Sequence, residues 1–303
     1  MPKILILDIG GTAVKASVMD EEKNVFEKEE HDTPHTSQQE LLLLIKNIYK
    51  KYASYKLEGI SISMPGIIDS ERGYAYTGGF LTYNCESNFS ALAEEYCGTK
   101  VFIENDGKCA ALAEMWCGSL KDVENGMVLV LGTGLGGGIM LNRKLVKGKH
   151  FSAGELSYLC LNDQKFGEEE AMAGSCCGSL GLVEAAKEVL KAEALDGRDF
   201  FNMLNKGNEL LEKVLEDYCS RIAVLVFNLQ MILDVQRVAF GGGISRQPRL
   251  IECLQNQIDK VFSNKVYQDF SPKLRPEVVA CSYFNESNQI GALYHYLNRT
   301  IHK

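Results

Sequence analysis

Two stretches of this chain predict the same three elements in the same order: an apolar strand, a glycine-rich turn and a second strand. LILDIGGTAVKASV stands near the beginning of the sequence, and LVLGTGLGGGIML follows about 120 residues later. The predicted strands are Lys3–Asp8 and Ala13–Met19 in the first stretch, and Met127–Leu131 and Ile139–Val146 in the second. We interpret the two hairpins as halves of a duplicated architecture whose turns face a shared cleft. A similarity of this length also arises by chance.

The turn of the first hairpin has the residues of a phosphate-binding site. Gly10 and Gly11 let the backbone approach a ligand closely, and their N–H groups can hold phosphate oxygens together with the Thr12 hydroxyl. Asp8, at the end of the strand, is placed to bind a hydrated magnesium ion beside such phosphates. Lys15 points either toward the same site or into solvent. The alternative is a plain hairpin in which the aspartate and the glycines serve only the turn.

The second glycine-rich turn resembles a dinucleotide-binding motif only formally. Gly132, Gly134 and Gly137 satisfy the G-x-G-x-x-G pattern, but in dinucleotide-binding proteins that pattern opens a helix. Here the following residues, IMLNRKLV, include an Asn-Arg-Lys turn and favour a strand, a turn and another strand. We therefore disfavour a nicotinamide site.

A third segment, VFIENDGKCAALAE, predicts a corner between a strand and a helix. Val101–Ile103 is apolar and β-branched, whereas Cys109–Glu114 consists of helix-forming residues, so Asn105 and Asp106 fall between the two elements. Such a corner aims side chains into a cleft, so Asn105 and Asp106 are candidates for a functional site. The alternative is that Asp106 only caps the helix, because aspartate is favoured at that position whatever the function.

The rest of the chain alternates strands and helices. A strand at Gln236–Phe240 ends in the tight turn Gly241–Gly243, an arrangement that commonly brings the backbone flat against a planar ligand. A further strand is predicted at Leu57–Ser63, and loops at His31–Ser37, Arg72–Asn88 and Leu161–Glu170. Helices are predicted at Gln38–Tyr52, Phe89–Cys97, Val183–Ala194, Glu209–Leu233 and Asn288–Leu297, with one more beginning at Pro248.

Bulk composition narrows the class of protein. A chain of 303 residues is expected to form two domains or one large unit with two lobes. The net charge of -8 and the pI near 5.3 argue against a nucleic-acid or anionic-membrane surface. The ten cysteines are scattered and no signal sequence precedes the first strand, which favours a reducing cytoplasm. No apolar run reaches the roughly 20 residues that a membrane-spanning helix needs.

Taken together, the motifs resemble those of the ROK family of sugar kinases and related repressors, whose fold is the actin-like ATPase (ribonuclease H-like) α/β fold. The matching segments occur in the family's order along nearly the whole chain. They are DIGGTAVK (Asp8–Lys15), MPG (Met64–Gly66), ENDGKCAALAE (Glu104–Glu114), LGTGLGGGI (Leu131–Ile139), AGE (Ala153–Glu155) and FGGGIS (Phe240–Ser245).

The resemblance implies two lobes with a duplicated βββαβα-type core around a central cleft. Residues 1–117, completed by a C-terminal helix at 287–303, would form a small lobe with the sugar-site base, and residues 118–286 a large lobe with the nucleotide site. The implied roles are Asp106 as general base; Gly66, Asn105, Glu155, Tyr158 and Glu184 at the sugar; Asp8, Gly10, Gly11, Thr12, Lys15, Thr133, Gly134, Gly241, Gly242 and Gly243 at ATP; and Asp8 at Mg²⁺ through water.

The chain departs from the family at a structural zinc site. Many members have a histidine shortly after the AGE motif and a CxCGxxGC cluster, but here Tyr158, Ser175 and Leu182 occupy three of the four ligand positions. Only Cys177 remains, and one thiolate cannot build a tetrahedral site, so we expect no structural zinc. Tyr158 could instead donate a hydrogen bond to the sugar or stack on it.

The expected activity is ATP-dependent phosphorylation of a hexose or hexoside at a primary hydroxyl, most simply the 6-OH of a glucose-like sugar. The loop YTGGFLTYNCESN differs from that of many glucose-specific members, and Tyr76, Phe80 and Tyr83 could accept a larger β-glucoside. N-acetylmannosamine is a further alternative. A sugar-responsive repressor is disfavoured, because the first strand begins near Lys3 without a preceding helix-turn-helix, and a silent sugar sensor is disfavoured by the retained Asp106. By analogy with the family we expect a homodimer.

Overall fold

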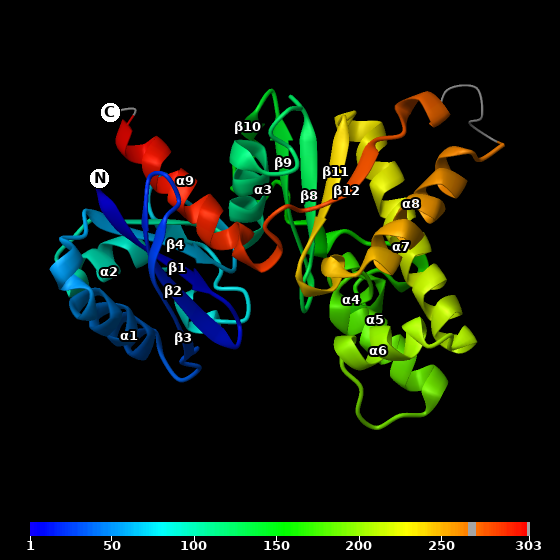
Figure 1. The fold of residues 1–303 in the computed structure, drawn as a ribbon, viewed down its shortest axis with the longest axis horizontal. Coiled ribbons are helices and arrows are strands. Elements are labelled where there is room, and N and C mark those ends of the chain that lie inside the picture. Colours follow the sequence, from blue (N-terminus) through cyan, green and yellow to red (C-terminus); the bar gives the residue numbers. More distant parts are fainter. Residues whose placement is uncertain (266–270, 302–303) are drawn as a thin grey trace. The chain divides into compact units, whose positions relative to one another are not determined.

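The computed structural model describes residues 1–265 and 271–301, and the chain divides into two compact units. Figure 1 shows the ribbon coloured along the sequence. Unit 1 comprises Met1–Trp116, Leu145–Gly154 and Glu286–Lys303, and unit 2 comprises Cys117–Lys144 and Glu155–Asn285. The segment Leu145–Gly154 therefore folds with unit 1, whereas the sequence-based division put it in the large lobe.

Unit 1 is built on a five-stranded mixed sheet (Figure 1). Strand β1 pairs with β2 in antiparallel orientation and with β4 in parallel orientation, while β2 pairs antiparallel with β3 and β4 pairs parallel with β7. In spatial order the strands are β3 (Val25–Asp32), β2 (Ala13–Asp20), β1 (Lys3–Ile9), β4 (Gly59–Met64) and β7 (Val101–Asn105). Two short strands, β5 (Ile68–Asp69) and β6 (Tyr74–Ala75), form a separate hairpin.

Side chains alternate between the two faces of this sheet, and each face is covered by helices. Leu5 and Leu7 of β1 lie in one apolar cluster with α1 (Gln38–Lys51) and α2 (Phe89–Cys97). Ile4 and Ile6 lie in a second cluster with residues of α3 (Asp106–Cys117) and α9 (Ser287–Ile301). Asp8 continues the second series, so its carboxylate is directed to the face of the sheet that α9 covers.

Unit 2 repeats the strand order of unit 1. Its sheet runs β10 (Lys144–Leu145), β9 (Leu135–Leu141), β8 (Gly126–Leu131), β11 (Arg237–Gly241) and β12 (Glu277–Ala280), with β8 antiparallel to β9 and parallel to β11. Its helices are α4 (Ala173–Cys176), α5 (Ser179–Leu190), α6 (Gly197–Asn205), α7 (Glu209–Leu233) and α8 (Pro248–Phe262). The two sheets match strand for strand, which confirms the predicted duplication.

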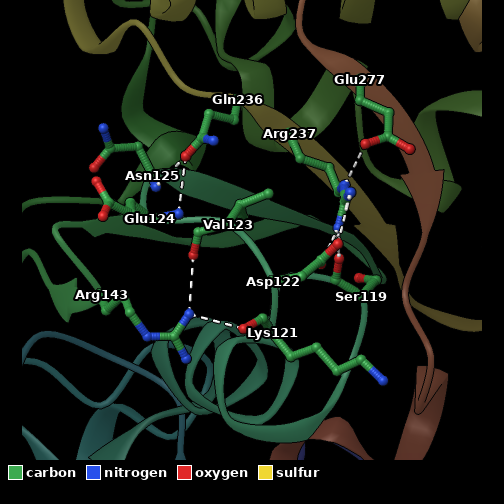
Figure 2. A network of polar contacts seen from close by, with 10 residues as sticks. All are labelled: Ser119, Lys121, Asp122, Val123, Glu124, Asn125, Arg143, Gln236, Arg237 and Glu277. Carbon is green, nitrogen blue, oxygen red and sulfur yellow. Dashed lines mark hydrogen bonds and ion pairs between the residues drawn. The ribbon is translucent and has the colours of Figure 1, made fainter.

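A network of polar contacts fixes the beginning of the unit 2 sheet (Figure 2). The Arg237 guanidinium donates to Glu277 Oε2 (2.6 Å), to the Ser119 carbonyl (2.5 Å) and to Asp122 Oδ1 (2.6 Å). Gln236 Oε1 accepts the backbone N–H groups of two residues in the same segment, Glu124 and Asn125. Because β11 begins at Arg237 and ends at Gly241, this network lies at the opposite end of the strand from the glycine-rich turn.

Most of the predicted elements are confirmed, with shifts of a few residues. Glu209–Leu233 and Phe89–Cys97 have the predicted bounds, and the strand ending at Asn105 is followed at once by a helix. The predicted helix Val183–Ala194 instead spans Ser179–Leu190.

Two sequence predictions about strands were wrong or incomplete. Strand β3 was not predicted, because its sequence VFEKEEHD has the charge of an exposed edge strand with few residues to bury. The second hairpin was predicted with a seven-residue turn, but β9 begins at Leu135, so three of the glycines lie within the strand. A Cβ at Gly137 would lie 2.6 Å from Leu156 Cδ1, so this glycine makes room for the segment that follows Glu155.

Candidate active site

The corner between β7 and α3 places a carboxylate at the start of a helix. Asn105 caps α3: its Oδ1 accepts the backbone N–H of Lys108 (3.0 Å), and its Nδ2 donates to the Gly66 carbonyl (2.9 Å). Asn105 thus supplies the hydrogen bond of the helix cap, and Asp106 is the first residue of the helix. Asp106 is half-buried, and its Oδ1 accepts the Gly107 N–H at 2.7 Å.

Gly66 joins the corner to a neighbouring loop of unit 1. It has φ of +108°, and an added Cβ would lie 2.0 Å from the Thr77 carbonyl oxygen, so the turn requires glycine. The loop after Thr77 presents the Phe80 side chain, which is 71% exposed. A Cβ at Gly11 would lie 3.8 Å from Phe80 Cδ2, so this ring stands beside the first glycine-rich turn.

The first glycine-rich turn is fixed by its own backbone and by one threonine. Gly10 N–H donates to the Ala13 carbonyl (2.9 Å), while Thr33 donates from its hydroxyl to the Gly10 carbonyl (2.8 Å) and from its N–H to the Thr12 carbonyl (3.0 Å). The Thr12 side chain is exposed, and Gly11 is half-buried. Two hydrogen bonds from Thr33 thus fix the conformation of the turn, and sequence reasoning did not single out this residue.

Asp8 lies next to this turn in a polar but buried position. Its Oδ1 accepts hydrogen bonds from Ser63 Oγ (3.0 Å) and from Asn288 Nδ2 (3.0 Å). Lys15 is the direct neighbour of Asp8 across the β1–β2 pair. Burial raises the pKa of Asp8 above its ordinary value, against the lowering effects of Asn288, Lys15 and Ser63.

The surroundings of Asp8 suit a magnesium ion held through water. Mg²⁺ in phosphate-transferring proteins is commonly bound by one or two carboxylates together with substrate phosphates. Asp8 supplies one such carboxylate beside a turn of the predicted phosphate-binding type, and a cation would favour its charged form. In residues 1–265 and 271–301 no group of three or more His, Cys, Asp or Glu side chains is placed to hold a metal ion.

Unit 2 contains a cavity of about 830 Å³ between its second glycine-rich turn and helices α5 and α6. Of the predicted nucleotide-binding residues, Thr133 and Gly243 line it, whereas Gly134, Gly241 and Gly242 are absent from its wall. The cavity combines apolar walls with basic side chains. Its lining includes Gly132, Thr133, Ser179, Leu180, Val183, Lys187, Asp196, Arg198, Phe201, Gly243, Ile244, Arg246, Gln247 and Asn285.

The second turn is attached to the beginning of α5. The Ser179 N–H donates to the Gly132 carbonyl at 2.7 Å, and a Cβ at Gly178 would lie 2.5 Å from the Thr133 carbonyl oxygen. On the other side of the cavity, Gly242 has φ of +90° and leads from β11 into the short helical turn Gly243–Arg246. A helix beginning beside a glycine-rich turn offers N–H groups to an anion.

Three predicted sugar-binding residues belong to unit 2. Glu155 directly precedes the helical turn Leu156–Tyr158, and the Tyr158 side chain is 65% exposed. Glu184 lies on α5, where its largely exposed carboxylate forms an ion pair with Lys187 at 2.8 Å. Gly66, Asn105, Asp106, Asp8, Gly10–Thr12 and Lys15 belong to unit 1, so the predicted site residues fall into two sets, one in each unit.

Sequence reasoning missed most of the cavity wall. Arg198 and Phe201 lie on α6, which was not predicted, although Asp196 and Asp199 form a capping box that marks its start. Arg246 and Gln247 follow the Gly241–Gly243 turn directly and were passed over as the approach to the next helix. These residues have no motif of their own, because their role depends on helices that only the fold brings together.

Two matched five-stranded sheets, each with a glycine-rich turn between its first two strands, define the class of this protein as an actin-like ATPase fold. Solved structures agree. A ROK family protein from Streptococcus pneumoniae TIGR4 in complex with sucrose matches with a TM-score of 0.86 and 24% identity, over 99% of this chain and 100% of that one. A ROK family glucokinase from Streptomyces griseus in complex with glucose and AMPPNP matches with a TM-score of 0.80 and 21% identity, over 96% and 98%.

The chain belongs to the ROK family, whose model matches residues 4–299. A β-glucoside kinase of Klebsiella pneumoniae is 28% identical over 298 residues, which cover 97% of this chain and 96% of the relative. The resemblance drawn from the sequence motifs is therefore confirmed, and the family's curated relatives found in the comparison include sugar kinases. In the described part of the chain, no helix is both long and apolar enough to cross a bilayer.

Proposed function

We propose that this ROK-family sugar kinase transfers the γ-phosphoryl group of ATP to the 6-OH of a β-glucoside, with the base in unit 1 and the nucleotide in unit 2. The observation that most supports it is the corner at Asp106. Because Asn105 supplies the helix cap, the adjacent carboxylate is not required for capping. A half-buried carboxylate at the start of a helix, at the same edge of the sheet as the first glycine-rich turn, has the position of a general base.

In this mechanism the Asp106 carboxylate accepts the proton of the sugar hydroxyl. The hydroxyl oxygen forms its new bond to the γ-phosphorus, the bond from that phosphorus to the bridging oxygen breaks, and ADP leaves with the electron pair. Bound magnesium supplies charge neutralisation for the phosphates, and Asp8 is the residue that would hold it through water. Backbone N–H groups of Gly10 and Gly11, with the Thr12 hydroxyl, would orient the phosphate oxygens.

The cavity of unit 2 supports ATP as the donor. Phe201, Val183 and Ile244 offer apolar walls for a base, while Lys187, Arg198 and Arg246 offer positive charge. The related glucokinase of Streptomyces griseus was solved with AMPPNP, which is consistent with this assignment. We propose Thr133 and Gly243 as direct neighbours of the nucleotide, and Gly134, Gly241 and Gly242 as residues that shape the turns behind it.

Two observations favour a β-glucoside over free glucose as the acceptor. Phe80 exposes most of its ring beside Gly11, in the loop whose Thr77 packs against Gly66, and we propose that this aromatic face stacks on an aglycone or a second sugar ring. The Klebsiella pneumoniae relative is a β-glucoside kinase. Tyr83 is a weaker candidate for this contact, because its hydroxyl donates to the Pro34 carbonyl.

A coupled ATP-consumption screen tests the proposal. The acceptors are glucose, N-acetylmannosamine, methyl β-glucoside, an aryl β-glucoside and cellobiose, with the position of the phosphate in each product read by NMR. We expect the aryl β-glucoside or cellobiose to give the highest kcat/KM, with the phosphate at the 6-position. A higher kcat/KM for glucose or N-acetylmannosamine would overturn the glucoside assignment, and no ATP consumption with any sugar would overturn the kinase assignment.

We also propose that the protein is a homodimer, as expected from the family resemblance. Light scattering of the full chain after size-exclusion chromatography measures the mass directly. A mass near twice that of the 33.6 kDa chain is the expected result, and a single-chain mass over the working concentration range would contradict it.

A further inference from the structure

The segment Leu145–Gly154, here called the strap, leaves the chain of unit 2, folds against unit 1 and returns directly to Glu155. Three polar contacts bind it to unit 1. Lys147 Nζ donates to Ser70 Oγ (2.6 Å) and lies 3.1 Å from Glu104 Oε2, and Lys108 Nζ donates to the Phe151 carbonyl (2.7 Å). The Phe151 ring also stacks on Tyr76, with centroids 6.5 Å apart.

The ion pair between Lys147 and Glu104 is unusual because its acidic partner is completely buried. The Glu104 side chain is 0% exposed, and that of Lys147 is 25% exposed. Burial is the largest influence on the Glu104 carboxyl and raises its pKa, but Lys147, His295 and the Asn105 N–H together lower it below the ordinary value. Glu104 is therefore ionised, and removing Lys147 would leave a buried negative charge without its compensating cation.

Glu104 is connected to the catalytic corner by consecutive hydrogen bonds. Its Oε1 accepts the backbone N–H of Asn105 at 2.9 Å. The Asn105 side chain in turn bonds to the Gly66 carbonyl and to the Lys108 N–H. A shift of the Glu104 carboxylate would therefore move the backbone that orients Asp106. Lys108 lies half a helical turn after Asp106 and also contacts the strap.

We propose that Lys147 is a positioning residue for phosphoryl transfer: by compensating Glu104 it holds the Asn105–Asp106 corner and the strap that leads to Glu155 in one fixed arrangement. This inference rests on the proposed function, because it assumes that Asp106 is the base. Its role is geometric, and neither Lys147 nor Glu104 is required to touch the sugar or the nucleotide.

The test compares three variants in the full-length protein. Lys147→Met keeps most of the side-chain volume and removes the charge, Lys147→Arg keeps the charge, and Glu104→Gln combined with Lys147→Met removes both charges. We expect Lys147→Met to lower kcat by about 10- to 100-fold, the scale of a misplaced reacting group, with the KM for ATP within about twofold of wild type. Lys147→Arg should recover most of the rate, and the double variant should be faster than Lys147→Met because no uncompensated charge remains.

Arg237→Met is the matched control. Arg237 is also a largely buried cation in an ion-pair network (Figure 2), but it begins β11, at the end of that strand remote from Gly241. It should lower the melting temperature without changing kcat at 25 °C. Hydrogen exchange gives a readout independent of activity: Lys147→Met should accelerate exchange in the amides of both the strap and the Asn105–Lys108 corner, and Arg237→Met in neither.

A Lys147→Met protein whose kcat stays within twofold of wild type, or whose exchange rises in the strap but not at the corner, overturns the inference. If Lys147→Met does not fold, the double variant decides: it should fold because no uncompensated charge remains, and a double variant that also fails to fold overturns the inference. Absence of sugar phosphorylation by the wild-type protein would instead refute the proposed function, so the two failures are distinguishable.

Discussion

The two sheets of this protein share one strand order but differ in what they bury. In unit 1 the buried side chains include acidic, basic and imidazole groups, whereas the described part of unit 2 buries no Asp, Glu, Lys, Arg or His side chain, and its buried polar groups include Gln230, Ser245, Gln257 and the Tyr218 hydroxyl. The buried ionisable groups of unit 1 include Asp8, Asp20, Asp69, Glu104, Lys108, Glu114 and His295. In unit 2 the basic side chains instead line an open cavity.

This difference in buried charge suits two different roles for the same topology, with the chemical step in unit 1 and nucleotide binding in unit 2. A buried charge is costly unless it is compensated, so the buried carboxylates Asp8 and Glu104, near the carboxyl ends of β1 and β7, are expected where chemistry requires fixed, desolvated groups. A nucleotide brings its own charge and needs only a cavity with basic and apolar walls. We therefore expect substitutions in unit 1 to affect the rate of chemistry, and substitutions at the unit 2 cavity to affect ATP binding.

The strongest test of this division is Asp106→Asn. Replacing the base should lower kcat by at least about 10²-fold, while the Kd for sugar and the KM for ATP change by less than about threefold. Steady-state kinetics and calorimetric titration measure these quantities. Asp163→Asn, which alters an exposed carboxylate in unit 2, is the control and should be neutral. A near-normal rate for Asp106→Asn would remove this residue from the role of base.

His295→Leu tests whether a buried ionisable group of unit 1 makes the free energy of unfolding depend on pH. Burial lowers the pKa of His295 from 6.5 to about 4, against the opposing effect of Glu104. Below pH 6.5 the unfolded chain binds a proton that the folded protein does not, so the stability from neutral His295 is present above pH 6.5 and lost as the pH falls toward 4.

The wild-type free energy of unfolding should therefore fall by roughly 2 kcal/mol between pH 6.5 and 4.5 from this group, and the fall should be smaller in His295→Leu. Urea denaturation at several pH values measures it. Equal pH dependence in the two proteins would show that His295 does not titrate abnormally, and would weaken the contrast between the two interiors.

Gly243→Val tests whether the cavity of unit 2 binds ATP. A Cβ at Gly243 would meet no atom within 4 Å, so the added side chain should be accommodated in the folded protein while occupying the cavity. The KM for ATP should rise about tenfold, and the KM for sugar should not change. Gly243→Ala should have a smaller effect of the same kind. An unchanged KM for ATP in Gly243→Val would place the nucleotide elsewhere.

Phe80→Ala is expected to have the smallest effect. It tests whether the Phe80 ring of unit 1 contacts the aglycone of a β-glucoside. Aromatic stacking is worth about 0.5–1.5 kcal/mol, so kcat/KM for an aryl β-glucoside should fall by roughly three- to tenfold, with little change for glucose. Phe166→Ala, which removes another exposed ring from unit 2, is the control. Equal losses for both acceptors would show that Phe80 does not contact the aglycone.

Sequence patterns predicted the duplicated hairpins, the strand-to-helix corner and the family, because these features are local and depend on glycines, β-branched runs and adjacent polar residues. The cavity wall was largely missed, since Arg198, Phe201 and Arg246 come together only through the packing of α6 beside the turns. The pairing of Lys147 with Glu104 has no local signal either, because it depends on the strap folding back onto unit 1.

The most direct measurement is a crystal structure of the ternary complex with a β-glucoside and a non-hydrolysable ATP analogue. The account predicts that the sugar's 6-OH lies within about 3 Å of an Asp106 carboxylate oxygen, and that the adenine occupies the unit 2 cavity beside Gly243. A 6-OH beyond hydrogen-bonding reach of Asp106, with another group in its place, would contradict it.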